Sequence, residues 1–147
     1  SLFSHKPDWT FDGADEVDSH FNLIKGRGGA MFKEKLLISS SPQTYILVDP
    51  YKKVERLGAK FPIPIEIFPE ALTYVEDKLQ RLNPREIKLR MGQGKDGPII
   101  TENGNMILDV WMDYIPENTE STLKSITGVL ESGLFMNYKV EVLGLTS

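Results

Sequence analysis

Two short segments of opposite charge lie close to each other in the first quarter of the chain. Residues 12–18 (DGADEVD) carry four carboxylates and no cation, whereas residues 25–35 (KGRGGAMFKEK) carry four cations against one carboxylate. If both segments border one pocket, the cations can stabilise a phosphate or a developing oxyanion while the carboxylates accept hydroxyl protons. The pair therefore predicts a site for a phosphorylated polyol. The alternative is that both segments are solvated surface, which is the more common meaning of charge runs.

Glu34 is the candidate general base. It falls in the first turn or two of a helix predicted over residues 31–41, where the helix dipole and the neighbouring Lys33 and Lys35 favour its ionised form. Because the same effects weaken it as a base, catalysis requires a closed pocket that desolvates the carboxylate and restores its basicity. A glutamate that only compensates the helix dipole is the alternative, and it stays open from the sequence.

The glycine-rich segment at residues 25–29 (KGRGG) matches neither the Walker pattern nor the dinucleotide fingerprint. Its glycines allow backbone N–H groups to approach a ligand closely, and the helix start that follows favours an anion. A glycine-rich turn without a ligand is the alternative. The acids at positions 12, 15 and 18 do not have the spacing of a calcium loop, so no metal site is expected.

The composition restricts the class of protein. The chain has 147 residues, is 40% apolar, carries a net charge of −4 and contains no cysteine. These values are typical of a globular protein with one ordinary domain or two small ones. An acidic chain without a long basic run is a poor candidate for nucleic-acid binding, and the absence of cysteine excludes disulfides, zinc–thiolate sites and a cysteine nucleophile. No membrane span is expected, and residues 1–7 lack the apolar core of a signal peptide.

The first third of the chain reads as one βαβ unit. A strand over residues 9–11, a helix over 31–41 and a strand over 44–48 predict two parallel strands joined by a right-handed crossover. The charged segments then follow the first strand and precede the helix, which is where α/β proteins place their chemistry. The alternating run at residues 138–143 could return to the same sheet.

The prolines at positions 62 and 64 suggest a boundary, and the elements beyond it follow a βαββαβ order. The expected elements are a strand at 65–68, a helix at 69–82, strands at 86–91 and 106–112, a helix at 117–127 and a strand at 129–135, with a tight turn at 103–105. The predicted fold class is α/β, a partial parallel Rossmann-like sheet plus a ferredoxin-like α+β domain. The predicted domains are residues 1–62 and 63–135, with residues 136–147 returning to the first.

Together, these motifs resemble the type A ribose-5-phosphate isomerase family, and the resemblance runs through nearly the whole chain. The segments that carry it are residues 12–18 (DGADEVD), 22–30 (NLIKGRGGA), 33–35 (KEK), 48–52 (VDPYK), 57–66 (LGAKFPIPIE), 96–105 (DGPIITENGN) and 132–135 (SGLF). Several distinctive motifs in this order make chance similarity a poor explanation.

The resemblance implies an isomerase of the pentose phosphate pathway that interconverts ribose 5-phosphate and ribulose 5-phosphate through a cis-enediolate. It implies that Glu34 moves the proton between C1 and C2 and that Lys25, with the loop backbone, stabilises the enediolate oxygen. The implied substrate-binding residues are Asp12, Gly13, Ala14, Asp15, Lys25, Gly26, Arg27, Gly28 and Lys52. A proton shuttle of this kind needs no metal and no organic cofactor. A cytoplasmic homodimer or homotetramer is expected, without nucleic acid or membrane as a partner.

Two departures from the family pattern affect these expectations. Arg27 stands where the family commonly has glycine, which adds a cation and narrows the pocket. The family also has an N-terminal Gly-Thr-Gly-Ser/Thr phosphate loop that this chain is expected to lack, leaving exposed sheet edges. The alternative function is a non-catalytic oligomerisation or small-ligand-binding module. RNA binding by residues 63–135 is disfavoured because that half has no basic, aromatic-rich strand.

Overall fold

The structure is a computed structural model that describes residues 8–94 and 96–144. Residues 1–7, which are expected to lack the apolar core of a signal peptide, lie outside the described residues. Within the described part, no helix is both long enough and apolar enough to span a membrane.

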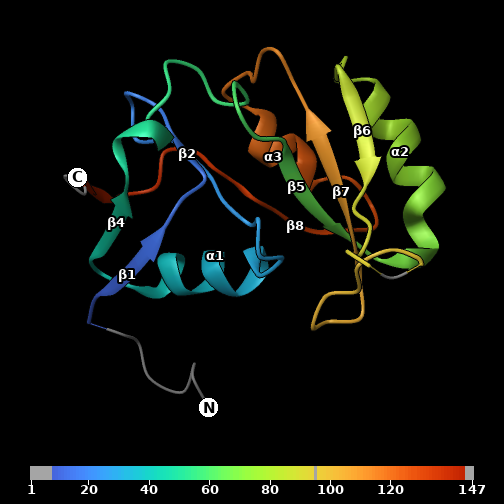
Figure 1. The fold of residues 1–147 in the computed structure, drawn as a ribbon, viewed down its shortest axis with the longest axis horizontal. Coiled ribbons are helices and arrows are strands. Elements are labelled where there is room, and N and C mark those ends of the chain that lie inside the picture. The colour runs from blue at the N-terminus through green and yellow to red at the C-terminus, as the bar shows by residue number, and fades with distance from the viewer. Residues whose placement is uncertain (1–7, 95, 145–147) are drawn as a thin grey trace.

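A parallel sheet of three strands contains the βαβ unit (Figure 1). The central strand β4 (Thr44–Val48) pairs with β1 (Thr10–Gly13) on one side and β10 (Glu141–Gly144) on the other. The helix α1 (Met31–Ser40) lies between β1 and β4 in the chain. Side chains alternate along β4, so that Ile46 and its neighbours two residues away are buried. The predicted βαβ unit and the return of the C-terminal run are both confirmed.

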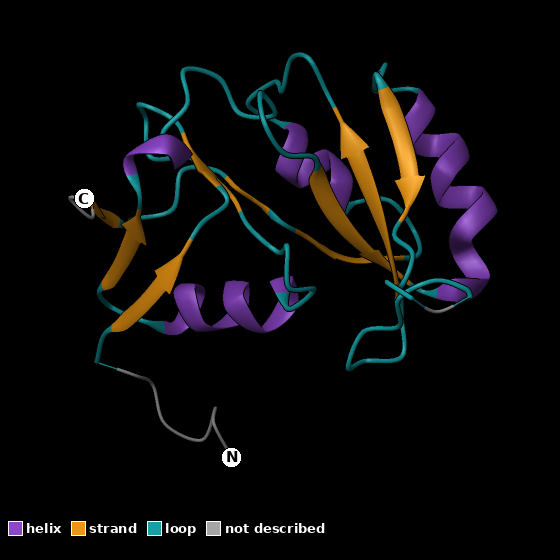
Figure 2. Cartoon of the chain, in the orientation of Figure 1, coloured by secondary structure: helices purple, strands orange, loops and turns teal. Residues whose placement is uncertain are grey.

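A second sheet is antiparallel and has the strand order β6-β7-β5-β8. Its strands are β5 (Ile63–Ile67), β6 (Glu86–Leu89), β7 (Met106–Trp111) and β8 (Val129–Ser132), and its helices are α2 (Leu72–Gln80) and α3 (Thr119–Lys124). Figure 2 shows both helices lying beside this sheet. One buried apolar cluster joins them to it. The βαββαβ order and the α/β class are confirmed. The helix predicted over 117–127 is shorter than expected, and the helix predicted over 69–82 begins with a 3-10 turn, η2 (Pro69–Ala71).

A small third sheet was not predicted. It consists of β2 (Glu16–Val17), β3 (Leu23–Ile24) and β9 (Leu134–Phe135), all paired antiparallel. Strands of two residues carry no readable alternation, so their sequence gives no signal. The strand expected over residues 129–135 is in fact two strands, β8 in the second sheet and β9 in this one.

Gly133 is the residue at which the chain passes from one sheet to the other. Its N–H donates to the carbonyl of Pro64 at 2.7 Å, and its own carbonyl accepts from the N–H of Lys25 at 2.8 Å. A Cβ atom at this position would overlap the carbonyl oxygen of Lys25 and lie 2.7 Å from Pro64 Cγ. The close approach therefore requires glycine, and it explains why the predicted single strand is interrupted. The predicted domain limits at residues 62 and 135 remain predictions.

Gly133→Ala is expected to destabilise the protein by at least about 2 kcal/mol, because the added methyl group forces apart backbone that cannot move independently. Gly144→Ala is the matched control, since a Cβ there would meet only the mobile end of Lys53, at 3.4 Å. The control is expected to change the free energy of unfolding by less than about 0.5 kcal/mol. Urea unfolding of both variants measures the difference, and equal losses would contradict the assignment.

Candidate active site

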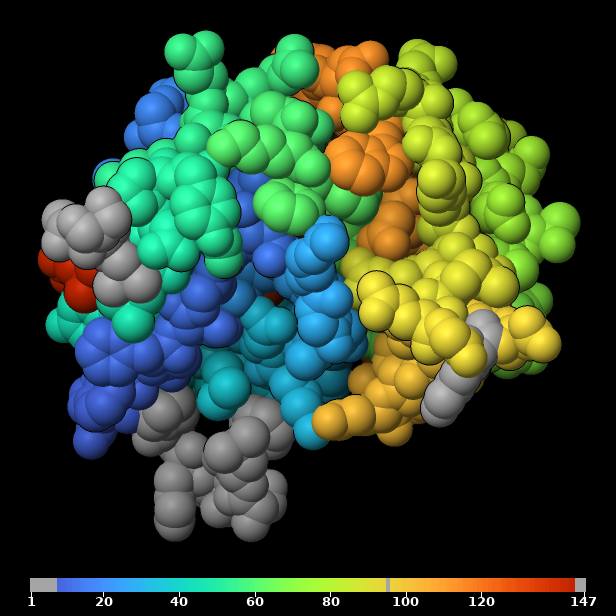
Figure 3. Space-filling model, in the orientation of Figure 1, coloured from blue at the N-terminus to red at the C-terminus, as the bar shows by residue number. Residues whose placement is uncertain are grey.

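A cavity of about 170 Å³ lies where β1, the glycine-rich loop and the first turn of α1 meet. Its lining residues are Gly13, Ala14, Asp15, Lys25, Gly26, Arg27, Gly28, Glu34 and Lys52. Lys52 belongs to a 3-10 turn, η1 (Pro50–Lys52), directly after β4. In the space-filling view, the surface is hollowed between the dark-blue segment around β1 and the light-blue glycine-rich loop (Figure 3). The structure thus brings together all the predicted site residues except Asp12, which contacts the cavity residue Lys25.

Lys25 is the centre of the site. Its side chain is only 3% exposed, and its Nζ lies 2.5 Å from Glu34 Oε2 and 3.1 Å from Asp12 Oδ2. It also donates to the carbonyl of Gly13 at the end of β1. A buried ammonium requires such partners, because burial without them costs several kcal/mol. The three acceptors, together with the backbone bond to Gly133, hold the cation at a fixed point beside Glu34.

Burial raises the pKa of Glu34 above its ordinary value. The nearby ammonium of Lys25 lowers this pKa and the carboxylate of Asp12 raises it, but the loss of water is the largest effect. The desolvation that a catalytic Glu34 requires is therefore present. Lys33 and Lys35 do not stabilise the ionised form of Glu34 in the way expected from the sequence. Lys33 pairs with Glu102, and Lys35 pairs with Glu120 in another part of the molecule.

The four carboxylates of the acidic segment divide into two pairs. Asp12 and Asp15 face the site, and burial raises the pKa of Asp15 although Lys25, Lys52 and Arg27 lower it. Asp15 Oδ2 also accepts the backbone N–H of Arg27 at 3.2 Å, which joins the two charged segments. The solvated-surface alternative therefore does not describe Asp15.

The other two carboxylates of that segment organise backbone. Glu16 is fully buried and accepts the N–H groups of Gly58 and Phe61, each at 2.7 Å. Asp18 accepts the N–H groups of His20 and Asn22, each at 2.9 Å. The sequence does not distinguish these two carboxylates from Asp12 and Asp15, because all four lie in one acidic segment. Their different roles follow only from the folded chain.

The glycine-rich loop has the backbone geometry that its composition indicates. Gly26 has a φ of 98°, and a Cβ there would lie 2.9 Å from Pro64 Cγ, so the loop packs too closely for a side chain. The guanidinium of Arg27 lies 4.8 Å from the centre of the Phe61 ring. The Arg27 side chain therefore stacks on Phe61, just before the start of β5. The backbone N–H of Arg27 bonds to Asp15 in the site.

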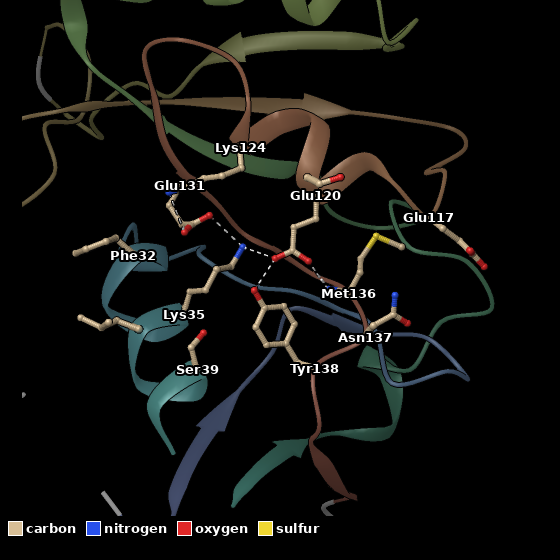
Figure 4. A pocket seen from close by; sticks show the side chains of 12 residues that line it. Phe32, Lys35, Ser39, Glu117, Glu120, Lys124, Glu131, Met136, Asn137 and Tyr138 are labelled. Atoms are coloured by element: carbon tan, nitrogen blue, oxygen red, sulfur yellow. Dashed lines mark hydrogen bonds and ion pairs between the residues drawn. The ribbon is translucent and has the colours of Figure 1, made fainter. Parts of the chain in front are cut away.

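A second polar cluster lies beside α1, and sequence reasoning missed it (Figure 4). Lys35 Nζ donates to Glu120 at 2.8 Å, to Glu131 at 3.2 Å and to the carbonyl of Leu134 at 2.8 Å. Tyr138 donates to Glu120 at 2.8 Å, and burial with this carboxylate raises the Tyr138 pKa. The cluster borders a larger cavity of about 540 Å³. Its lysine and carboxylates already bond to each other, which indicates an anchor for α1 rather than a reaction site.

The described residues contain no group of three or more histidine, aspartate or glutamate side chains placed to hold a metal ion. The site instead combines two carboxylates of raised pKa, Glu34 and Asp15, with one buried ammonium and a loop that presents its backbone. These groups can abstract a proton from carbon and stabilise the oxyanion that results.

The family profile of ribose 5-phosphate isomerase A (phosphoriboisomerase A) matches residues 2–146. The chain belongs to this family. It is 44% identical over 149 aligned positions to ribose-5-phosphate isomerase A of Methanothermobacter thermautotrophicus, covering 100% of this chain and 65% of that protein. The relative from Thermosynechococcus vestitus is 46% identical over 134 positions, covering 90% of this chain and 56% of that protein. The chain thus spans less than two thirds of these relatives' length.

Solved structures of the ribose 5-phosphate isomerase A family have the same fold. The structure from Methanocaldococcus jannaschii matches with a TM-score of 0.92 at 41% identity, over 99% of this chain and 65% of that one. A D-ribose-5-phosphate isomerase in complex with phospho-erythronic acid matches with a TM-score of 0.88 at 42% identity, over 93% of this chain and 61% of that one. The family resemblance predicted from the motifs is confirmed.

Lys35→Met is expected to lower the free energy of unfolding by about 3 kcal/mol, because it leaves the carboxylates of Glu120 and Glu131 without their buried cation. Lys124→Met is the matched control. Lys124 also lies near Glu131, at 3.4 Å, but its side chain is 52% exposed, so a loss below about 0.5 kcal/mol is expected. Urea unfolding at neutral pH compares the two, and similar losses would show that Lys35 is not an anchor.

Proposed function

We propose that this chain carries the catalytic groups of an aldose–ketose isomerase that interconverts ribose 5-phosphate and ribulose 5-phosphate. The observation that supports it most directly is the contact between Glu34 and the buried ammonium of Lys25, 2.5 Å apart in one cavity. Membership of the ribose 5-phosphate isomerase A family supports the substrate. A related isomerase that binds phospho-erythronic acid, a sugar-acid phosphate, supports the same substrate class.

In the proposed reaction, Glu34 takes the proton from C2 of the open-chain aldose and returns it to C1. The electron pair of the broken C–H bond forms the enediolate double bond, and negative charge develops on O1, the oxygen of the former carbonyl. Transfer of the O2 hydroxyl proton to O1 then moves this charge to O2, and the C2 carbonyl of the ketose forms as C1 takes the proton back from Glu34. Lys25 stabilises this charge electrostatically. Its ammonium does not have to move during the reaction, because Asp12 and Glu34 already hold it in place. The raised pKa of Glu34 suits a group that must accept a proton from carbon and then release it.

The remaining lining residues bind and orient the sugar in this proposal. Asp12 and Asp15 hold hydroxyl groups, and the raised pKa of Asp15 suits proton exchange during ring opening. Lys52 adds a cation at the wall of the cavity. The backbone of Gly13, Ala14, Gly26, Arg27 and Gly28 allows close approach of the substrate.

Assembly and location belong to the same proposal. We propose a cytoplasmic homodimer or homotetramer. Among the described residues, β1 and β10 are the edge strands of the parallel sheet, and Trp9, just before β1, and Phe11, within it, are each at least half exposed. Unpaired sheet edges flanked by exposed aromatic side chains favour association with further polypeptide. The oligomeric state can be measured by light scattering.

Glu34→Gln is expected to lower kcat by about 100- to 10,000-fold, because glutamine cannot accept the proton. Folding and substrate binding should persist, since the amide keeps the shape of the carboxylate. The measurements are ketose formation from ribose 5-phosphate and the thermal shift that ribose 5-phosphate produces in both proteins. If the unsubstituted chain neither turns over nor is stabilised by ribose 5-phosphate, the proposal fails and the non-catalytic module is favoured.

The pH dependence of kcat/KM should report the ionisation of Glu34. Because burial raises its pKa, the activity should decline on acidification at a pH above the 4.5 of an ordinary glutamate. Activity is lost toward acid pH because only the ionised carboxylate of Glu34 can act as a base, and protonation abolishes this form. Glu102, an exposed glutamate whose pKa is lowered by Lys33, offers the control, since Glu102→Gln should leave the profile unchanged. An acid limb at or below the ordinary value would contradict the role of Glu34.

A further inference from the structure

We infer that Arg90, which follows β6 in the second sheet, is a positioning residue for the reaction because it aims backbone N–H groups of the glycine-rich loop into the cavity. The inference rests on the proposed function. Arg90 Nη1 donates to the carbonyls of Gly26 at 3.3 Å and Arg27 at 3.0 Å. One side chain from a distant part of the chain therefore holds two consecutive peptide groups of the loop.

The guanidinium is itself held in a fixed orientation. Its Nε and Nη2 bond to the two carboxylate oxygens of Asp109, in β7, at 2.9 and 2.6 Å. Both side chains are 16% exposed, so the pair is shielded from water and oriented by its forked geometry. A lysine could neutralise Asp109, but it lacks the planar set of donors that reaches the carboxylate and both carbonyls together.

By holding a carbonyl, Arg90 also orients the N–H group of the same peptide. In a trans peptide the C=O and the N–H point in opposite directions. Since Arg90 holds the Gly26 carbonyl on one side, the N–H of Arg27 must point to the other, and there it donates to Asp15 Oδ2 in the cavity. The observed bond to Asp15 confirms the direction for the first peptide.

The same reasoning applies to the second peptide group. Arg90 holds the Arg27 carbonyl, so the N–H of Gly28 points away from Arg90, toward the cavity that Gly28 lines. Within the part of the chain that the structure describes, this N–H has no hydrogen-bond acceptor. It is therefore available for a developing oxyanion, and the guanidinium behind its carbonyl increases the polarity of the peptide.

Arg85 provides a matched control in the same pair of strands. It precedes β6 and pairs with Asp113, beyond β7, at 2.9 Å. The two side chains are 51% and 66% exposed. An arginine–aspartate pair is thus present near both ends of the β6–β7 ladder, but only that of Arg90 contacts the glycine-rich loop.

The test compares Arg90→Met, Arg90→Lys and Arg85→Met in the ribose 5-phosphate assay. Loss of an oxyanion donor lowers kcat by about 100- to 1,000-fold, and since Arg90 acts through the peptide we expect a decrease of about 10- to 100-fold. KM should change little, because the contact strengthens only as charge develops. Arg90→Lys should remain impaired, and Arg85→Met should stay within about twofold of the unsubstituted protein. If Arg90→Met behaves like Arg85→Met, the inference is wrong.

A second readout does not depend on turnover. In amide NMR spectra of the chain, Arg90→Met should shift the resonances of Arg27 and Gly28 and make the Arg27 amide, which bonds to Asp15, exchange faster with water, whereas Arg85→Met should not. If the unsubstituted chain shows neither isomerisation nor stabilisation by ribose 5-phosphate, the proposed function fails, and this readout alone decides whether Arg90 orients the loop. Unchanged amide resonances would overturn the inference. Should Arg90→Met fail to fold, Arg90→Met combined with Asp109→Asn removes the unpaired carboxylate and allows the same measurements.

Discussion

The candidate site depends on one buried charge, the ammonium of Lys25. A cation that is almost excluded from water must be surrounded by acceptors, and here they come from Asp12, the carbonyl of Gly13 and Glu34. The strand β1 supplies the first two and the helix α1 supplies the third. The need to neutralise Lys25 thus holds the end of the strand and the start of the helix together at the wall of the cavity.

The two larger sheets both contribute to this arrangement. Gly133, between β8 and β9, bonds to the backbone of Lys25 and of Pro64, so the second sheet holds the loop through main-chain contacts. Lys35 ties α1 to the β8–β9 segment (Figure 4). Arg90 contacts the same glycine-rich loop from β6. Three independent contacts therefore restrain a site whose own loop is rich in glycine and would otherwise be flexible.

Burial, more than charge, distinguishes the residues of this site from similar residues nearby. Glu34 and Asp15 lose water and have raised pKa values, whereas Glu102, which is exposed beside Lys33, has a lowered one. Nearby cations act on all three carboxylates, so the sign of the shift is decided by desolvation. The proposed role of Glu34 as a base requires this kind of environment, and a charge count cannot reveal it.

The sequence alone determined the order of the longer elements and the parallel pairing of β1 with β4, because these follow from local periodicity and from the handedness of a βαβ crossover. It offered the adjacency of the charged segments only as one of two alternatives. It did not determine which acids face the cavity, as Asp15 and Glu16 are neighbours of the same charge with different roles. Nor did it reveal the contact of Arg90 with the glycine-rich loop, 63 or more residues away in the chain. Burial and long-range contact exist only once the chain has folded, and they decide which carboxylate lines the cavity and which only holds the backbone.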